Sequence, residues 1–286
     1  MYNLRYHIAS LVAVFIALSV GLLLGTVVAE RGMITDQTTE LVADLQARFD
    51  EISAQNAELE AGLARDRAFA ESAVAPLTAG QLAGRNVAII VGTGRVDGIA
   101  AVSEAVSGAG GTTLTAALMT PALGLDAVEP EGLAGYFQLR GIEMAEPGEE
   151  LERQVAEALV AEWRAGADQP LTQLLASTGL LSIESSDGTA TVDAVVLMGS
   201  QESGCDAFGL ALGRSMDAAG GVALGAESSA ADGGCAAVCS AEGLSAVDHV
   251  ATAQGRFSLV WILAGRAEGY FGSGAGAQSF YPPLAP

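Results

Sequence analysis

Lysine is absent from this chain of 286 residues, so its 13 basic residues are all arginines. They stand against 34 acidic residues, which gives a formal net charge of −21. A surface with this balance repels the phosphate backbone of nucleic acids. We therefore expect no nucleic-acid partner.

Charged residues of either sign are scarce, at 16% of the chain, whereas hydrophobic residues make up 50% and the mean hydropathy is +0.39. Such a composition argues against a disordered chain and suggests a membrane segment beside a buried core. At roughly 100 to 200 residues per domain, the length allows one or two globular domains.

Histidine occurs only twice, at His7 and His249. Because His7 borders a long apolar run, a Ser or Cys triad would have only His249 as its base. The GxSxG motif that positions a nucleophilic serine in α/β-hydrolases is missing from the sequence. We therefore expect a protein that is not an enzyme.

Ile8 to Ala29 form a run of 22 residues without a charge. As a helix this run spans about 33 Å, enough for the roughly 30 Å hydrocarbon core of a bilayer. Arg5 precedes it, so the positive-inside rule places the N-terminus in the cytoplasm. The sequence predicts a single-pass cell-membrane protein, with a cytoplasmic tip and transmembrane helix in residues 1–33 and an extracytoplasmic remainder. A cleaved signal peptide, with small residues at Val27–Ala29, is the alternative.

Residues 34–76 are polar and poor in glycine, and their apolar residues recur every three to four positions. This spacing predicts a helix that forms a short juxtamembrane coiled-coil stalk. The heptad register places Val42, Phe49, Asn56 and Leu63 at a positions and Leu45, Ile52 and Leu59 at d positions. We expect a homodimer, or pairing with a partner helix, through Leu45, Phe49, Ile52, Asn56, Leu59 and Leu63.

Asn56 in this seam favours a parallel two-stranded arrangement, because its amide must pair with a counterpart. In the apolar run, Gly21 and Gly25 have the GxxxG spacing that lets two membrane helices approach closely. The alternative for residues 34–76 is a single amphipathic helix that lies on the chain's own globular domain.

Residues 84–264 alternate short β-type runs with alanine-rich helical stretches, which is typical of βαβ units around a mostly parallel sheet. We predict an α/β, Rossmann-like extracytoplasmic domain. The expected strands are Asn86–Val91, Thr112–Leu118, Val192–Met198, Gly221–Leu224, Ala236–Ser240 and Phe257–Leu263. The expected helices are Val96–Ser107, Gly148–Ala165, Leu171–Thr178 and Cys205–Ala219. Residues 265–286 are rich in Gly, Ser and Pro and are expected to form a loosely ordered tail.

Gly92, Gly94 and Gly98 follow the first expected strand, where glycines can let backbone N–H groups approach a phosphate. The spacing is GxGxxxG, however, and it differs from the dinucleotide-binding fingerprint. We interpret this segment as an ordinary strand-to-helix turn and expect no nucleotide cofactor.

Cys205, Cys235, Cys239 and His249, with Met198, are the candidates for soft metal ligands. Thiolate, thioether and imidazole groups suit Cu(I), so copper is the metal that they would bind. Two alternatives remain open: the cysteines are buried packing groups, or two of them form a local disulfide in an oxidising compartment.

Three parts of the sequence together resemble one known family: LRYHIASLVAVFIALSVGLLLGT, NVAIIVG followed by IAAVSEAVSGAGGT, and VDHVATAQGRFSLVWILAGRAEGYFGSGAGA. They are similar to the actinobacterial MctB family, which is named for copper transport and described as a mycobacterial outer-membrane copper channel. The resemblance implies a role in copper homeostasis and no catalytic residues. A related corynebacterial member, SteB, is associated with septal envelope assembly alongside a partner membrane protein. It implies the alternative of a coiled-coil scaffold in the cell envelope or at the septum.

Overall fold

The computed structural model describes residues 4–30, 33–94, 96–119, 130–166, 168–185, 191–199 and 205–284. The chain divides into two compact units, Met1–Asp66 and Arg67–Pro286. The first carries the apolar run and most of the predicted stalk, and the second carries the sheet. The predicted cytoplasmic tip begins with residues 1–3, which lie outside the described residues.

In the first unit, α1 (Leu4–Glu30) contains the apolar run, and the side chains of residues 5–28 are exposed. Among the described helices it alone is long and apolar enough to cross a membrane. The next helix, α2 (Met33–Thr78), extends into the second unit. The apolar residues of the predicted seam are exposed on α2, with 55% of Leu63 and 66% of Phe49 accessible to solvent.

The second unit contains one sheet of seven strands in the order β3-β2-β1-β4-β5-β6-β7. Neighbouring strands pair in parallel, except that β2 and β3 are antiparallel. The strands are β1 (Asn86–Val91), β2 (Thr112–Leu118), β3 (Leu181–Ser185), β4 (Ala194–Met198), β5 (Val222–Ala226), β6 (Ser245–Val247) and β7 (Tyr270–Phe271). The expected α/β class with a mostly parallel sheet is confirmed, and β1 and β2 have the predicted bounds.

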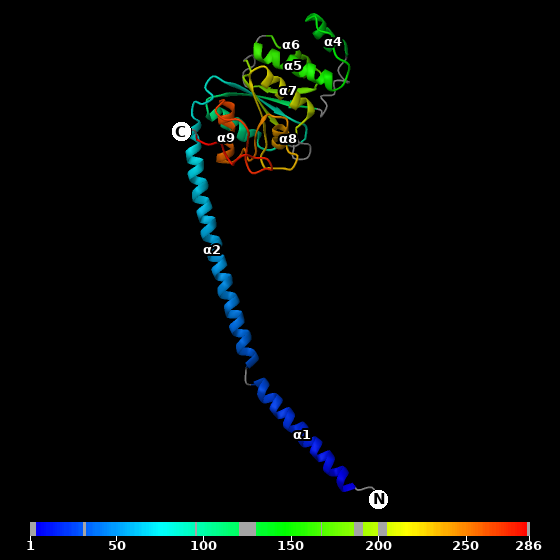
Figure 1. The fold of residues 1–286 in the computed structure, drawn as a ribbon, viewed down its shortest axis with the longest axis vertical. Coiled ribbons are helices and arrows are strands. Elements are labelled where there is room, and N and C mark those ends of the chain that lie inside the picture. Colours follow the sequence, from blue (N-terminus) through cyan, green and yellow to red (C-terminus); the bar gives the residue numbers. More distant parts are fainter. Residues whose placement is uncertain are drawn as a thin grey trace. The chain divides into compact units, whose positions relative to one another are not determined.

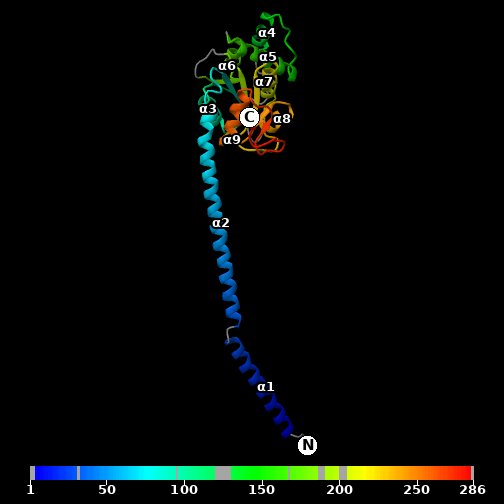
Figure 2. The ribbon, with the colours of Figure 1, turned by 60° about the vertical axis from the view of Figure 1, so that its left-hand side comes forward.

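Helices cover both faces of this sheet (Figure 1 and Figure 2). Ala88 and Ile90 of β1 belong to one core cluster, whereas Val87 and Ile89 belong to the other, because successive side chains of a strand point to opposite faces. The first cluster includes residues of α5 and α7, and the second includes residues of α3 and α9. The helices are α3 (Ile99–Gly108), α4 (Pro130–Leu139), α5 (Glu149–Ala165), α6 (Pro170–Ser177), α7 (Ala207–Ala218), α8 (Cys235–Ala241) and α9 (Ala253–Leu263).

Two of the predicted strands are wrong. Ala236–Ser240 lies in α8, and Phe257–Leu263 lies in α9. Seven consecutive residues of α9, from Phe257 to Leu263, are buried, so the segment has no polar face that would reveal a helical period. A short apolar run of this kind fits a buried strand and a buried helix equally well.

The prediction of a loosely ordered tail is also wrong for part of residues 265–286. Tyr270 and Phe271 form β7, pair with β6 and are buried. Ser273 and Gly274, two and three residues beyond the end of β7, donate their backbone N–H groups to the buried carboxylate of Asp248. A strand of two residues is too short to show periodicity, and its partner lies 24 residues earlier in the chain.

Candidate metal-binding site

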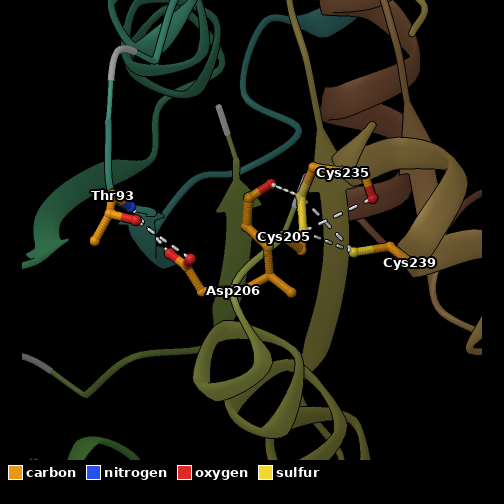
Figure 3. The surroundings of a disulfide bond; sticks show 6 residues. Thr93, Cys205, Asp206, Cys235 and Cys239 are labelled. Carbon is orange, nitrogen blue, oxygen red and sulfur yellow. Dashed lines mark hydrogen bonds between the residues drawn. A yellow bond between two sulfur atoms is a disulfide. The ribbon is translucent and has the colours of Figure 1, made fainter. Parts of the chain in front are cut away.

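The three cysteines meet at one place beside the sheet, although 30 residues separate Cys205 from Cys235 (Figure 3). Cys205 lies two residues before α7, while Cys235 is the first residue of α8 and Cys239 follows one turn later. Residues four apart lie on the same face of a helix, so both cysteines of α8 point toward Cys205. All three Sγ atoms lie within 4.8 Å of one another.

Cys205 and Cys235 form a disulfide, with their Cα atoms 4.6 Å apart. Cys239 is a free thiol whose Sγ atom lies 3.5 Å from that of Cys205 and 4.0 Å from that of Cys235. The cluster therefore combines a local disulfide with a buried packing thiol, the two alternatives to a metal site. Reduction of the disulfide would leave three thiols at one place.

Burial differs among the three cysteines. Cys235 and Cys239 are buried, with 1% and 0% of their surface exposed, whereas Cys205 is partly exposed. Cys239 packs directly on β5, where a Cβ atom at Gly225 would lie 2.6 Å from its Sγ atom. The glycine therefore makes room for the thiol, and Cys205 is the cysteine nearest to solvent.

The electrostatic surroundings hold Cys239 in its protonated form. Burial, with a smaller contribution from the negative charges of Glu227 and Glu242, raises the pKa of its thiol from 9.0 to about 12, and Arg214 opposes the shift. A metal bound by this sulfur must displace its proton, because the thiolate is the ligand. Metal affinity at Cys239 would therefore increase with pH.

The structure does not bring His249 into the cysteine group. Its Nδ1 atom lies 2.6 Å from the Oδ1 atom of Asp248, and its backbone has a left-handed φ of 53°. Met198 is also separate, since it belongs to the core cluster on the opposite face of the sheet. Of the predicted soft ligands, only the cysteines come together.

Asp248, the partner of His249, is itself buried and saturated with donors. Its carboxylate accepts hydrogen bonds from the Tyr270 hydroxyl at 2.9 Å and from the backbone N–H groups of Ser273 and Gly274. Burial raises the pKa of Asp248, but the hydrogen bonds from His249 and these donors outweigh burial and hold the pKa below its ordinary value. Asp248 thus attaches the C-terminal segment to the sheet.

The glycine-containing turn after β1 binds a carboxylate of this chain. Thr93 donates its backbone N–H to the Oδ2 atom of Asp206 at 3.0 Å, and a Cβ atom at Gly92 would lie 2.6 Å from that oxygen. The turn lies at the carboxyl end of β1, beside β4, where strand order reverses and α/β sheets commonly bind ligands. In this chain the carboxylate of Asp206 accepts hydrogen bonds from the backbone N–H and the hydroxyl of Thr93 in this turn.

Two acidic residues near the cysteines were not identified from the sequence. Asp206 directly follows Cys205, and Glu227 directly follows β5 and accepts hydrogen bonds from the backbone N–H groups of Cys235 and Ala236. Burial raises the pKa of both carboxyls. Hydrogen bonds from Thr93 to Asp206, and from backbone N–H groups to Glu227, only partly offset this rise. Their positions, next to a strand end or a helix start, are the signal that could have revealed them.

Comparison with known proteins agrees with the resemblance seen in the sequence. The model of one family, described as "Copper transport outer membrane protein, MctB", matches residues 1–282. No curated protein and no solved structure matches the chain. The match covers the apolar helix, α2 and nearly all of the α/β unit, so the predicted family is confirmed.

Proposed function

Because this chain belongs to the MctB family of copper transport proteins, we propose that it is a membrane-anchored protein that binds Cu(I) through Cys205, Cys235 and Cys239. The observation that carries the proposal is the convergence of three sulfur atoms within 4.8 Å. Thiolates are among the soft protein ligands that select Cu(I). The donor set therefore fits the metal in the family's description.

The proposed site has a redox requirement. As a disulfide, Cys205 and Cys235 offer no thiolate, and Cys239 alone remains. Two electrons and two protons from a dithiol reductant convert the disulfide into two thiols. Cu(I) then displaces protons from the sulfurs that bind it. The partly exposed Cys205 is the sulfur through which the metal enters, because the other two are buried.

The proposed topology has α1 as a membrane anchor, the N-terminus in the cytoplasm and the α/β unit outside. The length and apolar surface of α1 support an anchor, and Arg5 near its start supports this orientation. A water-filled pore needs several helices or strands to enclose it, because the bilayer leaves backbone polar groups unsatisfied. One apolar helix does not meet that need, so we assign the copper role to binding.

We also propose a Rossmann-like classification for the α/β unit. Its first six strands have the order 3-2-1-4-5-6, which is the order of doubly wound nucleotide-binding folds. The antiparallel β3 departs from that fold. The likeness concerns topology alone, since the turn after β1 binds the carboxylate of Asp206.

A second candidate function, an envelope scaffold that binds another membrane protein, is favoured by one observation. The apolar residues of α2 at heptad spacing, among them Leu45, Ile52 and Leu59, are exposed. Contiguous apolar residues that are exposed to solvent commonly mark interaction surfaces. A scaffold requires no metal, so copper binding distinguishes the two functions.

The experiment is a Cu(I) titration of the full chain in detergent, without oxygen and against a chromophoric Cu(I) chelator. The reduced chain is expected to bind one Cu(I), and the oxidised chain is expected to bind none. Cys239→Ser and Cys205→Ser should both lose the reduced-state binding. His249→Ala is the matched control and should bind as the unmodified chain does.

Each variant is first compared with the unmodified chain by circular dichroism, so that loss of copper is not confused with loss of fold. If the reduced chain competes no better than Cys239→Ser, or if His249→Ala loses the metal as well, the three-cysteine site is wrong. The scaffold would then be the better account.

A further inference from the structure

The stalk helix presents an apolar seam to solvent. Its members alternate by three and four residues, which is the spacing of a coiled coil. Each has more than half of its surface exposed, from 55% at Leu63 to 66% at Leu59 and Phe49. All of the seam, from Val42 to Leu63, lies within the first unit. A seam of this length that faces water needs a partner helix.

The residues that flank the seam allow this partner to be an identical helix. In a parallel dimer each g position faces the e position five residues later in the other copy. The facing pairs are Arg48 with Ser53, Gln55 with Glu60, and Gly62 with Arg67. No pair places like charges together, so a chain with a net charge of −21 can still pair with itself here.

Most acidic residues of the stalk lie away from the seam. Asp44, Asp50, Glu51 and Glu58 occupy b and c positions. Three of them have partners on their own helix: Asp44 accepts from Arg48 at 2.9 Å, Asp50 from Gln46, and Glu51 from Gln55. These i,i+4 contacts hold negative charge on the outer face of α2.

Asn56 specifies the register of such a pair. In a parallel dimer of identical helices it faces Asn56 of the other copy, and the two amides can donate to and accept from each other. On α1, a Cβ atom at Gly21 or Gly25 would meet nothing within 4 Å, so this small-residue face is open to a close helix partner as well. The two helices thus offer separate surfaces for the same kind of partner.

We infer that α2 pairs with α2 of a second copy as a parallel two-stranded coiled coil between Val42 and Leu63. The parallel direction rests on the proposed topology, since two copies anchored by α1 in one membrane point the same way. The pairing of α2 does not involve copper, so it is independent of the metal site.

The test uses single cysteines introduced into the full chain in membranes and a short bifunctional maleimide, which needs no oxidant. Leu45→Cys and Leu63→Cys lie at opposite ends of the seam and should each give a band of twice the chain's mass. Ala54→Cys, on the outer f position, is the control and should give none. Homotypic crosslinks at both ends require the parallel direction, because an antiparallel pair would join position 45 to the opposite end.

A second measurement keeps the seam free of cysteine. Two differently tagged copies should co-purify, Ile52→Asn should abolish this, and Ala54→Asn should not. A crosslinked band of another mass would reveal a foreign partner, and equal crosslinking at positions 45 and 54 would reveal random collision. Either result overturns the homodimer. Cu(I) binding by the Ile52→Asn variant shows separately whether the metal site is intact.

Discussion

The Sγ atom of Cys239 lies 3.5 Å from the Sγ atom of Cys205, which is already bonded to Cys235. One disulfide and one inaccessible thiol therefore share a place that three thiols could occupy after reduction. We predict that the native chain gives no reaction with Ellman's reagent, because Cys239 is buried and its pKa is raised to about 12. Unfolding without a reductant should release one thiol per chain, and unfolding after reduction should release three.

If unfolding without a reductant released three thiols per chain, the disulfide would be contradicted. Rapid reaction of the folded chain would contradict the burial of Cys239. Cys239→Ser is the control, since it should remove the single thiol released by denaturant and leave the disulfide in place.

Gly225→Ala should disturb the cysteine cluster. The added Cβ atom would lie 2.6 Å from the Cys239 Sγ atom and 2.8 Å from the backbone oxygen of Cys235, so α8 must shift. Overpacking of this kind costs about 1 to 3 kcal/mol of unfolding free energy, measured by urea denaturation. Gly209→Ala in α7 is the matched control, because its Cβ atom meets nothing within 4 Å.

Gly209→Ala should leave the unfolding free energy unchanged or raise it by up to about 1 kcal/mol, since alanine stabilises a helix relative to glycine. Equal effects of the two substitutions would show that the contact between Gly225 and Cys239 carries no special constraint.

Asp206→Asn should stabilise the fold or leave it unchanged near neutral pH. Burial raises the pKa of this carboxyl, and the hydrogen bonds from Thr93 offset the effect only in part. A raised pKa means that the native state favours the protonated carboxyl. Asp206 therefore stabilises the fold at pH values below 3.8, the pKa of the unfolded state, and this stabilisation is lost as the pH rises through the native pKa. Asparagine keeps an acceptor for the Thr93 N–H and avoids the buried charge.

Thermal unfolding at several pH values measures this effect. The difference in Tm between Asp206→Asn and the unmodified chain should be positive or near zero at pH 7 and should shrink as pH falls toward 4. A large loss of stability at pH 7 would mean that the ionised carboxylate is needed by the turn.

Asp248→Asn should destabilise the α/β unit. Asp248 has the opposite shift, because its hydrogen bonds outweigh burial and lower the pKa. Its contribution to stability is therefore present at pH values above 3.8, the pKa of the unfolded state, and is lost as the pH falls through the native pKa. Replacing a buried charged acceptor that binds several donors costs about 2 to 3 kcal/mol.

Urea denaturation at pH 7 measures this cost, and the difference should diminish in acid. Asp217→Asn on the exposed surface of α7 should change the unfolding free energy by no more than about 0.5 kcal/mol. If the two variants were equally stable, Asp248 would not be what attaches the C-terminal segment to the sheet.

Much of the fold could be predicted from local sequence. The apolar run predicted α1, and the bounds of β1 and β2 were predicted correctly, because each element has a strong periodicity or composition of its own. By contrast, α9 is buried over its last seven residues and was mistaken for a strand. The two-residue strand β7 was missed because it exists only through its pairing with β6.

The candidate site, too, could be predicted from the sequence only in part. The sequence by itself determined that soft ligands were few, that an apolar helix began the chain and that the family was MctB. Only the tertiary structure decided that Cys205 meets Cys235 and Cys239 while His249 pairs with Asp248. Periodicity reports the interactions of neighbours along the chain, whereas this cluster depends on how β5, α7 and α8 pack, and that packing is a property of residues far apart in sequence.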